Sequence, residues 1–467
     1  MGIRSFARSC SVVGLIAGFA ACGNHRGAAD HDAAVGPPDA CTELACFQVD
    51  CASKGRPSTT VSGTVFAPNG SLKLYGVNVY VPASDPGPLP AGVQCDRCGA
   101  LPGGSLTATI TDEDGHFTLD GVHATSDVPI VIQVGKWRRR LIMPNVAACQ
   151  DTPLAAADTR LPRDKTEGDM PQIAITTGDA DALECLVRKL GIADSEFTTN
   201  TGPGAVHLYR GNGAKAFAPG FAGGTGDLSP ALPFWNSTDV LGTYDVVMLS
   251  CEGDQNIAPG GAAANINAKP QSSLQALHDY AGVGGRVFMS HWHNVWIGGN
   301  KADPTNVNYG IPAWKSLITW AFNAAQDEAT QLAIVDETVP KGTAFATWLQ
   351  NVMATTTRGE LTVSQPRYTA ASADATQTER WVFVDPARST PAGKHSVQNV
   401  LFTTPIEAPV EQRCGKVVFS DMHVASGSTS KAATAFPGGC NTGPLTAQEK
   451  ALAFIFFDIS SCVGVLQ

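Results

Sequence analysis

Two apolar runs decide how this chain is expected to fold, YDVVMLSCEG at Tyr244–Gly253 and GGRVFMSHWHN at Gly284–Asn294. A third run, KVVFSDMH at Lys416–His423, repeats the pattern. Short apolar runs that are bounded by turn residues and separated by helical segments are typical of buried parallel strands. Ligands of open α/β sheets bind at the carboxyl ends of such strands. We therefore expect the side chains that end these three runs to meet at one rim of a sheet.

Each run ends in residue types that can ligate a metal ion or take part in catalysis. They are Cys251 and Glu252 after the first run, His291, Trp292 and His293 after the second, and Asp421 and His423 in the third. One hypothesis is a site for a divalent metal such as zinc, whose common ligands are Cys, His and carboxylate. Its expected ligands are His291, His293, His423 and Asp421.

A second hypothesis pairs the Cys251 thiol with His291 or His423 as an activated nucleophile for hydrolysis of an amide or ester. Glu252, Trp292, His293 and Asp421 would then contact the ligand. A third interpretation is structural: the histidines bond buried carbonyl groups, and Cys251 is a small core residue. The sequence leaves all three open.

The chain from residue 171 to 467 alternates expected strands with expected helices. QIAITT, VHLYR, YDVVMLS, RVFMS and KVVFS read as strands, and the last helix is TAQEKALAFIFFDIS. This alternation predicts a doubly wound, mostly parallel sheet of the flavodoxin type. A segment of about 296–408 interrupts the pattern, and we expect it to form a lid or an added subdomain.

Residues 59–146 have a different pattern, with short alternating segments separated by Gly, Pro, Asn and Asp. They predict a small antiparallel β-sandwich. The fold class is therefore α/β plus all-β, and the polar residues 147–170 are expected to be a linker.

The N-terminus has the layout of a secretory signal, with Arg4 and Arg8 before the apolar stretch Val12–Ala21. We expect residues 1–22 to be a lipoprotein signal peptide with the lipid on Cys22, and residues 23–58 to be a flexible tether with a cysteine cluster. The protein would then be exported to the bacterial outer membrane or cell surface, where the lipid anchor makes the membrane a partner. The net charge of −10 disfavours nucleic acid as a partner.

Export makes disulfides the expected state of most of the 13 cysteines. Without Cys10 in the signal and the lipidated Cys22, 11 remain, so at least one is left over, and we expect it to be Cys251. Short sequence separation suggests local pairing within three groups: Cys41, Cys46 and Cys51; Cys95 with Cys98 or Cys149; Cys414 with Cys440 or Cys462.

Two family resemblances add to this interpretation. The strand ending in YVP and the turn TDEDGHF at Thr111–Phe117 resemble the carboxypeptidase regulatory-like domain, which is a transthyretin-like sandwich. The runs Tyr244–Ser250 and Gly284–His291 resemble the class I glutamine-amidotransferase-like superfamily, most closely its ThuA-like branch. The turn that carries the amidotransferase Cys has His291 here, so the amidotransferase triad does not carry over.

The whole arrangement resembles uncharacterised bacterial lipoproteins. Two functions remain open: a hydrolase-like or ligand-binding site for an extracellular carbohydrate or peptide, and a non-catalytic surface protein that binds or scaffolds a partner.

Overall fold

The computed structural model describes residues 48–257, 266–322, 329–364, 366–389, 396–424 and 435–464. They belong to the unit Leu44–Gln467. The expected signal peptide, Cys22, and the tether up to residue 47 lie outside the described residues. Among the helices of the described part, none is both long and apolar enough to cross a bilayer.

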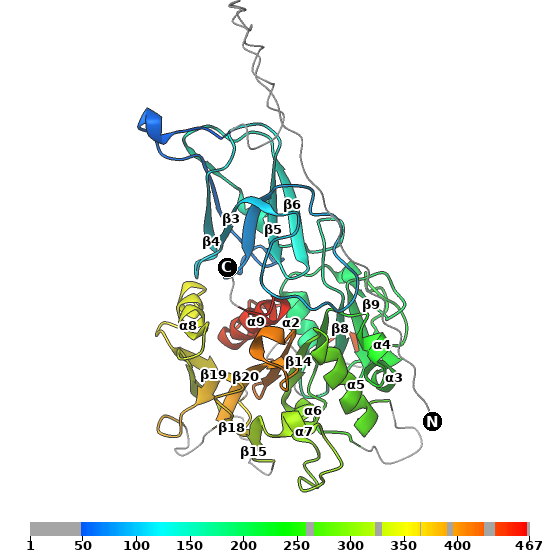
Figure 1. The fold of residues 1–467 in the computed structure, drawn as a ribbon. Coiled ribbons are helices and arrows are strands. Elements are labelled where there is room, and N and C mark those ends of the chain that lie inside the picture. Colours follow the sequence, from blue (N-terminus) through cyan, green and yellow to red (C-terminus); the bar gives the residue numbers. More distant parts are fainter. Residues whose placement is uncertain are drawn as a thin grey trace, which may run out of the picture. The chain divides into compact units, whose positions relative to one another are not determined.

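The N-terminal part of this unit is all-β and has two small sheets, with strand orders β4-β1-β7 and β3-β2-β5-β6 (Figure 1). Their strands are β1 Thr60–Thr64, β2 Asn78–Pro82, β3 Ser105–Ile110, β4 His116–Asp120, β5 Val128–Val134, β6 Trp137–Met143 and β7 Asp151–Pro153. Strand β4 shows the period-two pattern that the sequence predicts, with Phe117 and Leu119 buried and their neighbours exposed. Asp112 stabilises the acidic turn before this strand, because its Oδ1 accepts hydrogen bonds from the backbone N–H groups of Asp114 and His116 at 2.9 and 2.8 Å.

The expected linker 147–170 is instead part of this fold. Strand β7 pairs in parallel with β1, and the Thr60 and Ser62 hydroxyls donate to the Asp151 carboxylate at 2.8 and 2.6 Å. A disulfide between Cys51 and Cys149 also fixes the end of the expected tether. The polar composition misled the prediction because β7 is an edge strand whose outer side faces water.

The C-terminal part is built on one large sheet with the order β12-β10-β8-β13-β14-β21-β20-β19-β16-β17. The first six strands are parallel. They are β12 Ser229–Pro230, β10 Val206–Arg210, β8 Ile173–Thr176, β13 Val246–Leu249, β14 Arg286–Ser290 and β21 Gly415–Ser420. Another short strand, β9 (Phe197–Thr198), pairs with β10 off this path. The apolar runs of the sequence therefore become the buried central strands, as expected.

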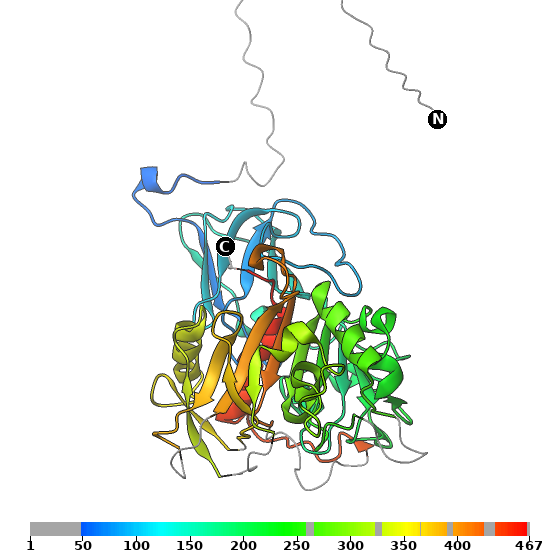
Figure 2. The same cartoon turned by 60° about the horizontal axis from the view of Figure 1, so that its bottom comes forward.

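The segment 296–408, expected as a lid or added subdomain, mainly widens this sheet. Its strands are antiparallel and are β16 Gln331–Val335, β17 Glu360–Val363, β19 Glu379–Val384 and β20 Ser396–Thr404. Figure 2 shows them, from yellow to orange, continuing the sheet. The prediction missed this because β20 joins the sheet through β21, which follows it in the sequence.

Helices cover both faces of the parallel strands. Val247 and Leu249 of β13 pack in the same core as Leu277 of α5 (Gln271–Gly282), whereas Met248 points into the core that contains α9 (Ala447–Ser460). Helix α9 begins at a capping box formed by Thr446 and Glu449.

Helix α9 also joins the β region to the sheet. Its Phe454 stacks on Tyr75 and its Phe457 packs against Trp137, with ring centroids 5.9 and 6.2 Å apart. The two parts therefore share one apolar core.

The disulfides of the described part are Cys51–Cys149, Cys95–Cys414, Cys98–Cys462 and Cys185–Cys440, with sequence separations of 98, 319, 364 and 255 residues. They connect distant segments, so the local pairings expected for Cys51, Cys95 and Cys414 are wrong. Cys41 and Cys46 lie outside the described residues. Pairing follows distance in the fold, and the loop that carries Cys95 and Cys98 lies against the base of the sheet. Within the described part, Cys251 is the free cysteine, as expected.

Candidate functional site

The three apolar runs end side by side at one rim of the sheet. Ser290 of β14 is opposite Ser420 of β21, and Met289 of β14 is opposite Leu249 of β13. Since parallel strands in register end at the same edge, the residues that follow them converge there. The short 3-10 helix η4 (His291–Asn294) turns the chain directly after β14.

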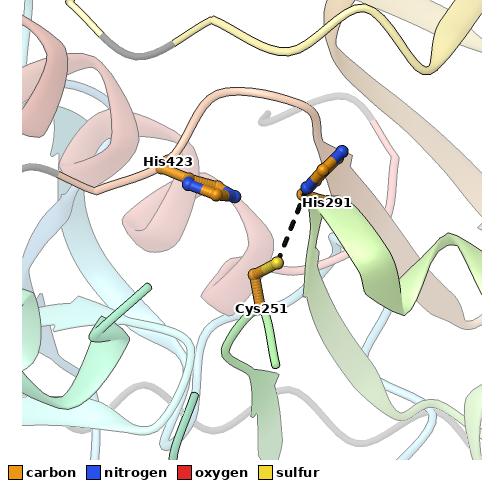
Figure 3. Close-up of side chains that lie close together, drawn as sticks. All are labelled: Cys251, His291 and His423. Carbon is orange, nitrogen blue, oxygen red and sulfur yellow. Dashed lines mark hydrogen bonds between the residues drawn. The ribbon is translucent and has the colours of Figure 1, made fainter. Parts of the chain in front are cut away.

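Three side chains at this rim form a tight, buried cluster (Figure 3). Cys251, His291 and His423 each offer one ligand atom, and these atoms lie within 4.8 Å of one another. The Cys251 Sγ is 3.6 Å from His291 Nδ1. All three residues are at most 1 % exposed.

The Cys251 thiol keeps its proton at neutral pH, because burial raises its pKa to about 12. The thiol can donate to His291 Nδ1 when that nitrogen carries no proton. The loop after β8 packs tightly on the same residue: a Cβ at Gly178 would lie 2.3 Å from the carbonyl oxygen of Cys251. A protonated and buried thiol disfavours the hypothesis of a Cys nucleophile. A metal ion bound through the same Sγ would have to displace this proton.

His291 sits in a strained backbone conformation, with φ of +33° immediately after β14. Residues other than glycine rarely adopt positive φ, and such strain often marks functional sites. The Nε2 atom of His291 lies 2.9 Å from Thr369 Oγ1 and 3.9 Å from Asp421 Oδ1. Thr369 at Nε2 and Cys251 at Nδ1 therefore orient the ring through both nitrogens.

Asp421 is fully buried and lies next to the Nε2 side of the His291 ring. Its Oδ2 accepts the backbone N–H groups of Thr369 and Ala370 at 2.7 and 2.9 Å, whereas its Oδ1 has no hydrogen-bond partner. Burial raises its pKa to about 7, against the lowering effect of those two N–H groups. Asp421 is thus placed beside His291 and is not one of the three clustered ligands.

His423 faces His291, with ring centroids 5.2 Å apart. Its Nδ1 accepts a hydrogen bond from Arg367 Nη2 at 3.1 Å, and its Nε2 is buried without a hydrogen-bond partner. Burial lowers the pKa of His423 well below its usual value, and the nearby His291 and Arg367 add to this. The neutral ring carries its proton on Nε2 in this arrangement.

His293, expected as a metal ligand, is directed elsewhere. Its Nε2 donates to the carbonyl oxygen of Ser250 at 2.9 Å, and its Nδ1 accepts from Trp296 Nε1 at 2.8 Å. Both ring nitrogens are therefore used by the protein. The chain turns within η4, so two histidines that are two residues apart do not share a centre.

Glu252, expected to contact a ligand, forms a buried ion pair with Lys269 at 2.5 Å and accepts from Asn267 at 3.0 Å. Its role is to hold the loop after β13. The ring of Trp292, also expected to contact a ligand, lies under Lys301 Nζ, 4.0 Å from the ring centroid.

Sequence reasoning missed several buried groups at this rim. Asp181 accepts from the Val424 backbone N–H at 2.8 Å and lies 2.5 Å from Ser290 Oγ. Burial raises its pKa to about 7 and that of Glu184 to about 8. Asp181 follows β8 as Cys251 follows β13, so the rule of strand ends could have found it. Arg367 precedes strand β18 (Ala370–Ala373) and no sequence signal placed it here.

The cluster has the residue types of a zinc site, and one of its three ligand-to-ligand distances has the length that such a site requires; the other two are at most 4.8 Å. With Zn–S near 2.3 Å and Zn–N near 2.0–2.1 Å, tetrahedral ligands place S and N about 3.5 Å apart. The 3.6 Å between Cys251 Sγ and His291 Nδ1 fits this value. Three protein ligands leave a fourth position for water or substrate, as in catalytic zinc sites.

Comparison with known proteins assigns no family to the chain. No family model matches it, and no curated protein matches it. Solved structures with some likeness include a protein described as ThuA-like from Bacteroides uniformis ATCC 8492, with 12 % identity and a TM-score of 0.29, covering 61 % of this chain and 90 % of that one. Another is the cytoplasmic protein STM1381 from Salmonella typhimurium LT2, with 11 % identity and a TM-score of 0.31, covering 62 % of this chain and 96 % of that one. The description of the fold rests on the strand order and register given above.

Proposed function

We propose that this chain is an exported, lipid-anchored protein whose α/β part holds a zinc ion at the rim and uses it for hydrolysis. The observation that carries the proposal is the cluster of Cys251, His291 and His423, whose ligand atoms lie within 4.8 Å. A zinc ion at such a centre lowers the pKa of a bound water molecule and makes it a nucleophile.

The surroundings of His291 support the proposal. Histidines that bind zinc through one nitrogen usually donate the other N–H to an oxygen atom. His291 offers Nδ1 to the cluster and directs Nε2 toward Thr369 Oγ1 at 2.9 Å. Asp421 Oδ1 lacks a hydrogen bond and lies 3.9 Å from the same nitrogen, where it can take up a proton.

The substrate class in this proposal is an extracellular carbohydrate or peptide. We also propose that the α/β part is related to the ThuA-like branch, on the basis of the resemblance of Tyr244–Ser250 and Gly284–His291. The disulfides of the chain suit an oxidising compartment.

The test is the zinc content of the purified, tag-free full chain and of four variants. Cys251→Ser, His291→Asn and His423→Gln each remove one expected ligand. Asn is chosen at 291 because it tolerates positive φ better than most residues. His278→Gln is the matched control, because His278 lies on α5 away from the cluster.

We expect about one zinc per chain in the unaltered protein and the control, and much less in the three ligand variants. Zinc that is absent from the unaltered protein, or that persists in all three variants at unchanged stability, would overturn the proposal. If the variants lose about 1–3 kcal/mol of stability and the protein never holds metal, the cluster is structural.

One observation favours a second candidate, a non-catalytic surface protein. The Arg367 guanidinium contacts His423, and a fixed positive charge opposes a bound cation. The elemental analysis separates the two candidates.

Attachment to the membrane is tested through Cys22. We expect the unaltered protein in the membrane fraction and Cys22→Ser in the soluble fraction. A Cys22→Ser variant that is processed and stays with the membrane would contradict lipidation at this residue.

A further inference from the structure

A second candidate site lies away from the rim, between the β region and the α/β part. It is a cleft of about 930 Å³ whose walls come from the loop around Asn69, helix α2 (Leu183–Lys189), the end of helix α8 (Gly342–Asn351) and the residues before α9. A neighbouring hollow of about 550 Å³ shares Asn69, Arg163 and Gly191 with it. The two together form one groove, and each hollow taken separately has a volume in the range of small-ligand sites.

The lining of the groove is rich in cationic side chains, although the whole chain has a net charge of −10. Its lining includes six cationic side chains: Lys73, Arg160, Arg163, Arg188, Lys189 and Lys450. Among the described residues that line it, Asp194 is the one acidic side chain. Clefts lined by one sign of charge concentrate ligands of the opposite sign.

Four of these cations pair with carboxylates. The pairs are Lys73–Asp114, Arg160–Glu167, Arg188–Asp194 and Lys189–Glu449. Three of the four carboxylates lie outside the lining; Glu449 is fully buried, whereas Asp114 is exposed to solvent.

The other two cations contact main-chain oxygen atoms. Arg163 Nε donates to the Gly191 carbonyl at 3.3 Å, and Lys450 Nζ donates to the Val352 carbonyl at 2.6 Å. Arg163 is exposed and lies where the two hollows meet. These two side chains therefore supply positive charge to the groove with no carboxylate bonded to them in the described part.

The remaining walls suit a sugar chain better than a nucleic acid. Short amide and hydroxyl side chains line them: Asn69, Ser71, Asn351, Asn441 and Thr442. Such groups can bond ring hydroxyls. Of the described residues that line the groove, none is aromatic, so stacking of bases has no platform.

We propose that this groove binds an acidic glycan, with Arg163 and Lys450 contacting its carboxylate or sulfate groups. The site is independent of the metal cluster, and its test does not depend on zinc. A surface-anchored protein with such a groove would attach to acidic polysaccharide outside the cell.

The experiment measures binding of the full chain in detergent to oligogalacturonate, to neutral dextran and to polyglutamate by calorimetry. The variants are Arg163→Gln and Arg163→Gln/Lys450→Gln. The matched control is Lys54→Gln/Arg56→Gln, which removes the same charge from exposed positions outside the groove. Thermal unfolding of each variant checks that it is folded, because Lys450 also bonds the end of α8.

We expect oligogalacturonate to bind, with affinity that falls as ionic strength rises. Each charge-assisted hydrogen bond that is lost should weaken binding by at least about tenfold, and the control should bind as the unaltered protein does. Absent binding, equal binding of dextran, or equal binding by folded groove variants would overturn the proposal. Polyglutamate that binds as tightly as the glycan would also overturn it, in favour of an acidic peptide.

Discussion

Arg367 Nη2 donates a hydrogen bond to Nδ1 of His423 over 3.1 Å, and this bond decides which nitrogen of His423 holds the proton. With Nδ1 as the acceptor, the neutral ring keeps its proton on Nε2, the atom without a partner. Ligation of zinc through Nε2 would move the proton to Nδ1, where it would face the guanidinium. Arg367 therefore opposes metal binding through both its charge and its donor.

Replacing Arg367 with Gln is expected to tighten zinc binding about tenfold, the usual scale of effects from groups that support a ligand. The substitution removes the positive charge, and the side-chain carbonyl of Gln can accept the Nδ1–H of His423. Competition with a chromogenic chelator measures the affinity. Arg413→Gln is the matched control, since Arg413 is 6 % exposed and lies elsewhere, bonded to Ala408. Equal or weaker affinity in Arg367→Gln would show that the arginine does not oppose the metal.

The positive φ of His291 predicts an unusual order of stability among variants. His291→Gly and His291→Ala both delete the ring, but alanine keeps the strain at φ of +33°. Glycine adopts this conformation without a steric penalty, so we expect His291→Gly to be more stable than His291→Ala by about 1 kcal/mol. Urea unfolding of both variants measures the difference. Alanine equal to or above glycine would mean that the backbone relaxes when the ring is removed.

Asp181 predicts a pH dependence of stability. Its pKa rises from 3.8 to about 7 on burial in the folded protein. Between these values the folded state binds the proton and the unfolded state releases it, so this group lowers the free energy of unfolding as pH rises from about 4 to 7. At about 1.4 kcal/mol per pKa unit, the loss is a few kcal/mol.

Asp181→Asn tests this, because Asn resembles the protonated acid in shape and charge, and its amide oxygen can still accept the Val424 N–H. We expect the variant to match the unaltered protein near pH 4 and to exceed it near pH 8, as measured by urea unfolding at each pH. His293 and His423 have lowered pKa values and act in the opposite direction, but they are present in both proteins and cancel in the difference. The difference therefore reports Asp181 together with its effect on the pKa of Glu184 and Cys251. A constant difference across pH would contradict the raised pKa.

The strand ends of the site could be predicted because buried parallel strands have a local signature. Cys251, His291 and His423 each follow an apolar run, and one rule places them together. The direction of His293 could not be predicted, since it depends on a turn of one 3-10 helix. Arg367 and Thr369 lie in the irregular segment before β18, which belongs to a separate two-stranded sheet with β15 (Ile318–Trp320), so no strand-end pattern leads to them.

The same limit explains the disulfides. Cys95 and Cys98 have the spacing of a local pair, but they bond to Cys414 and Cys462. Three-dimensional proximity between segments more than 300 residues apart leaves no trace in sequence spacing. The free Cys251 could be predicted because it directly follows a central strand and is close in sequence to no other cysteine.

The two long-range disulfides predict how the β region and the α/β part unfold. Cys95–Cys414 and Cys98–Cys462 join the two parts across separations of 319 and 364 residues. Shared packing around α9 also joins them, so we expect one cooperative transition while the bonds are intact. Replacing all four cysteines with Ser should lower the free energy of unfolding by about 2–5 kcal/mol, because the unfolded chain gains freedom.

Cys51→Ser/Cys149→Ser is the comparison, because that bond lies within the β region. Scanning calorimetry measures both forms. Two unfolding transitions in the four-Ser variant would show that the disulfides, more than the shared core, hold the two parts together. A single transition at a lower temperature would instead assign that role to α9 and its contacts with Tyr75 and Trp137. An unchanged free energy of unfolding would contradict the stabilising role of the bonds.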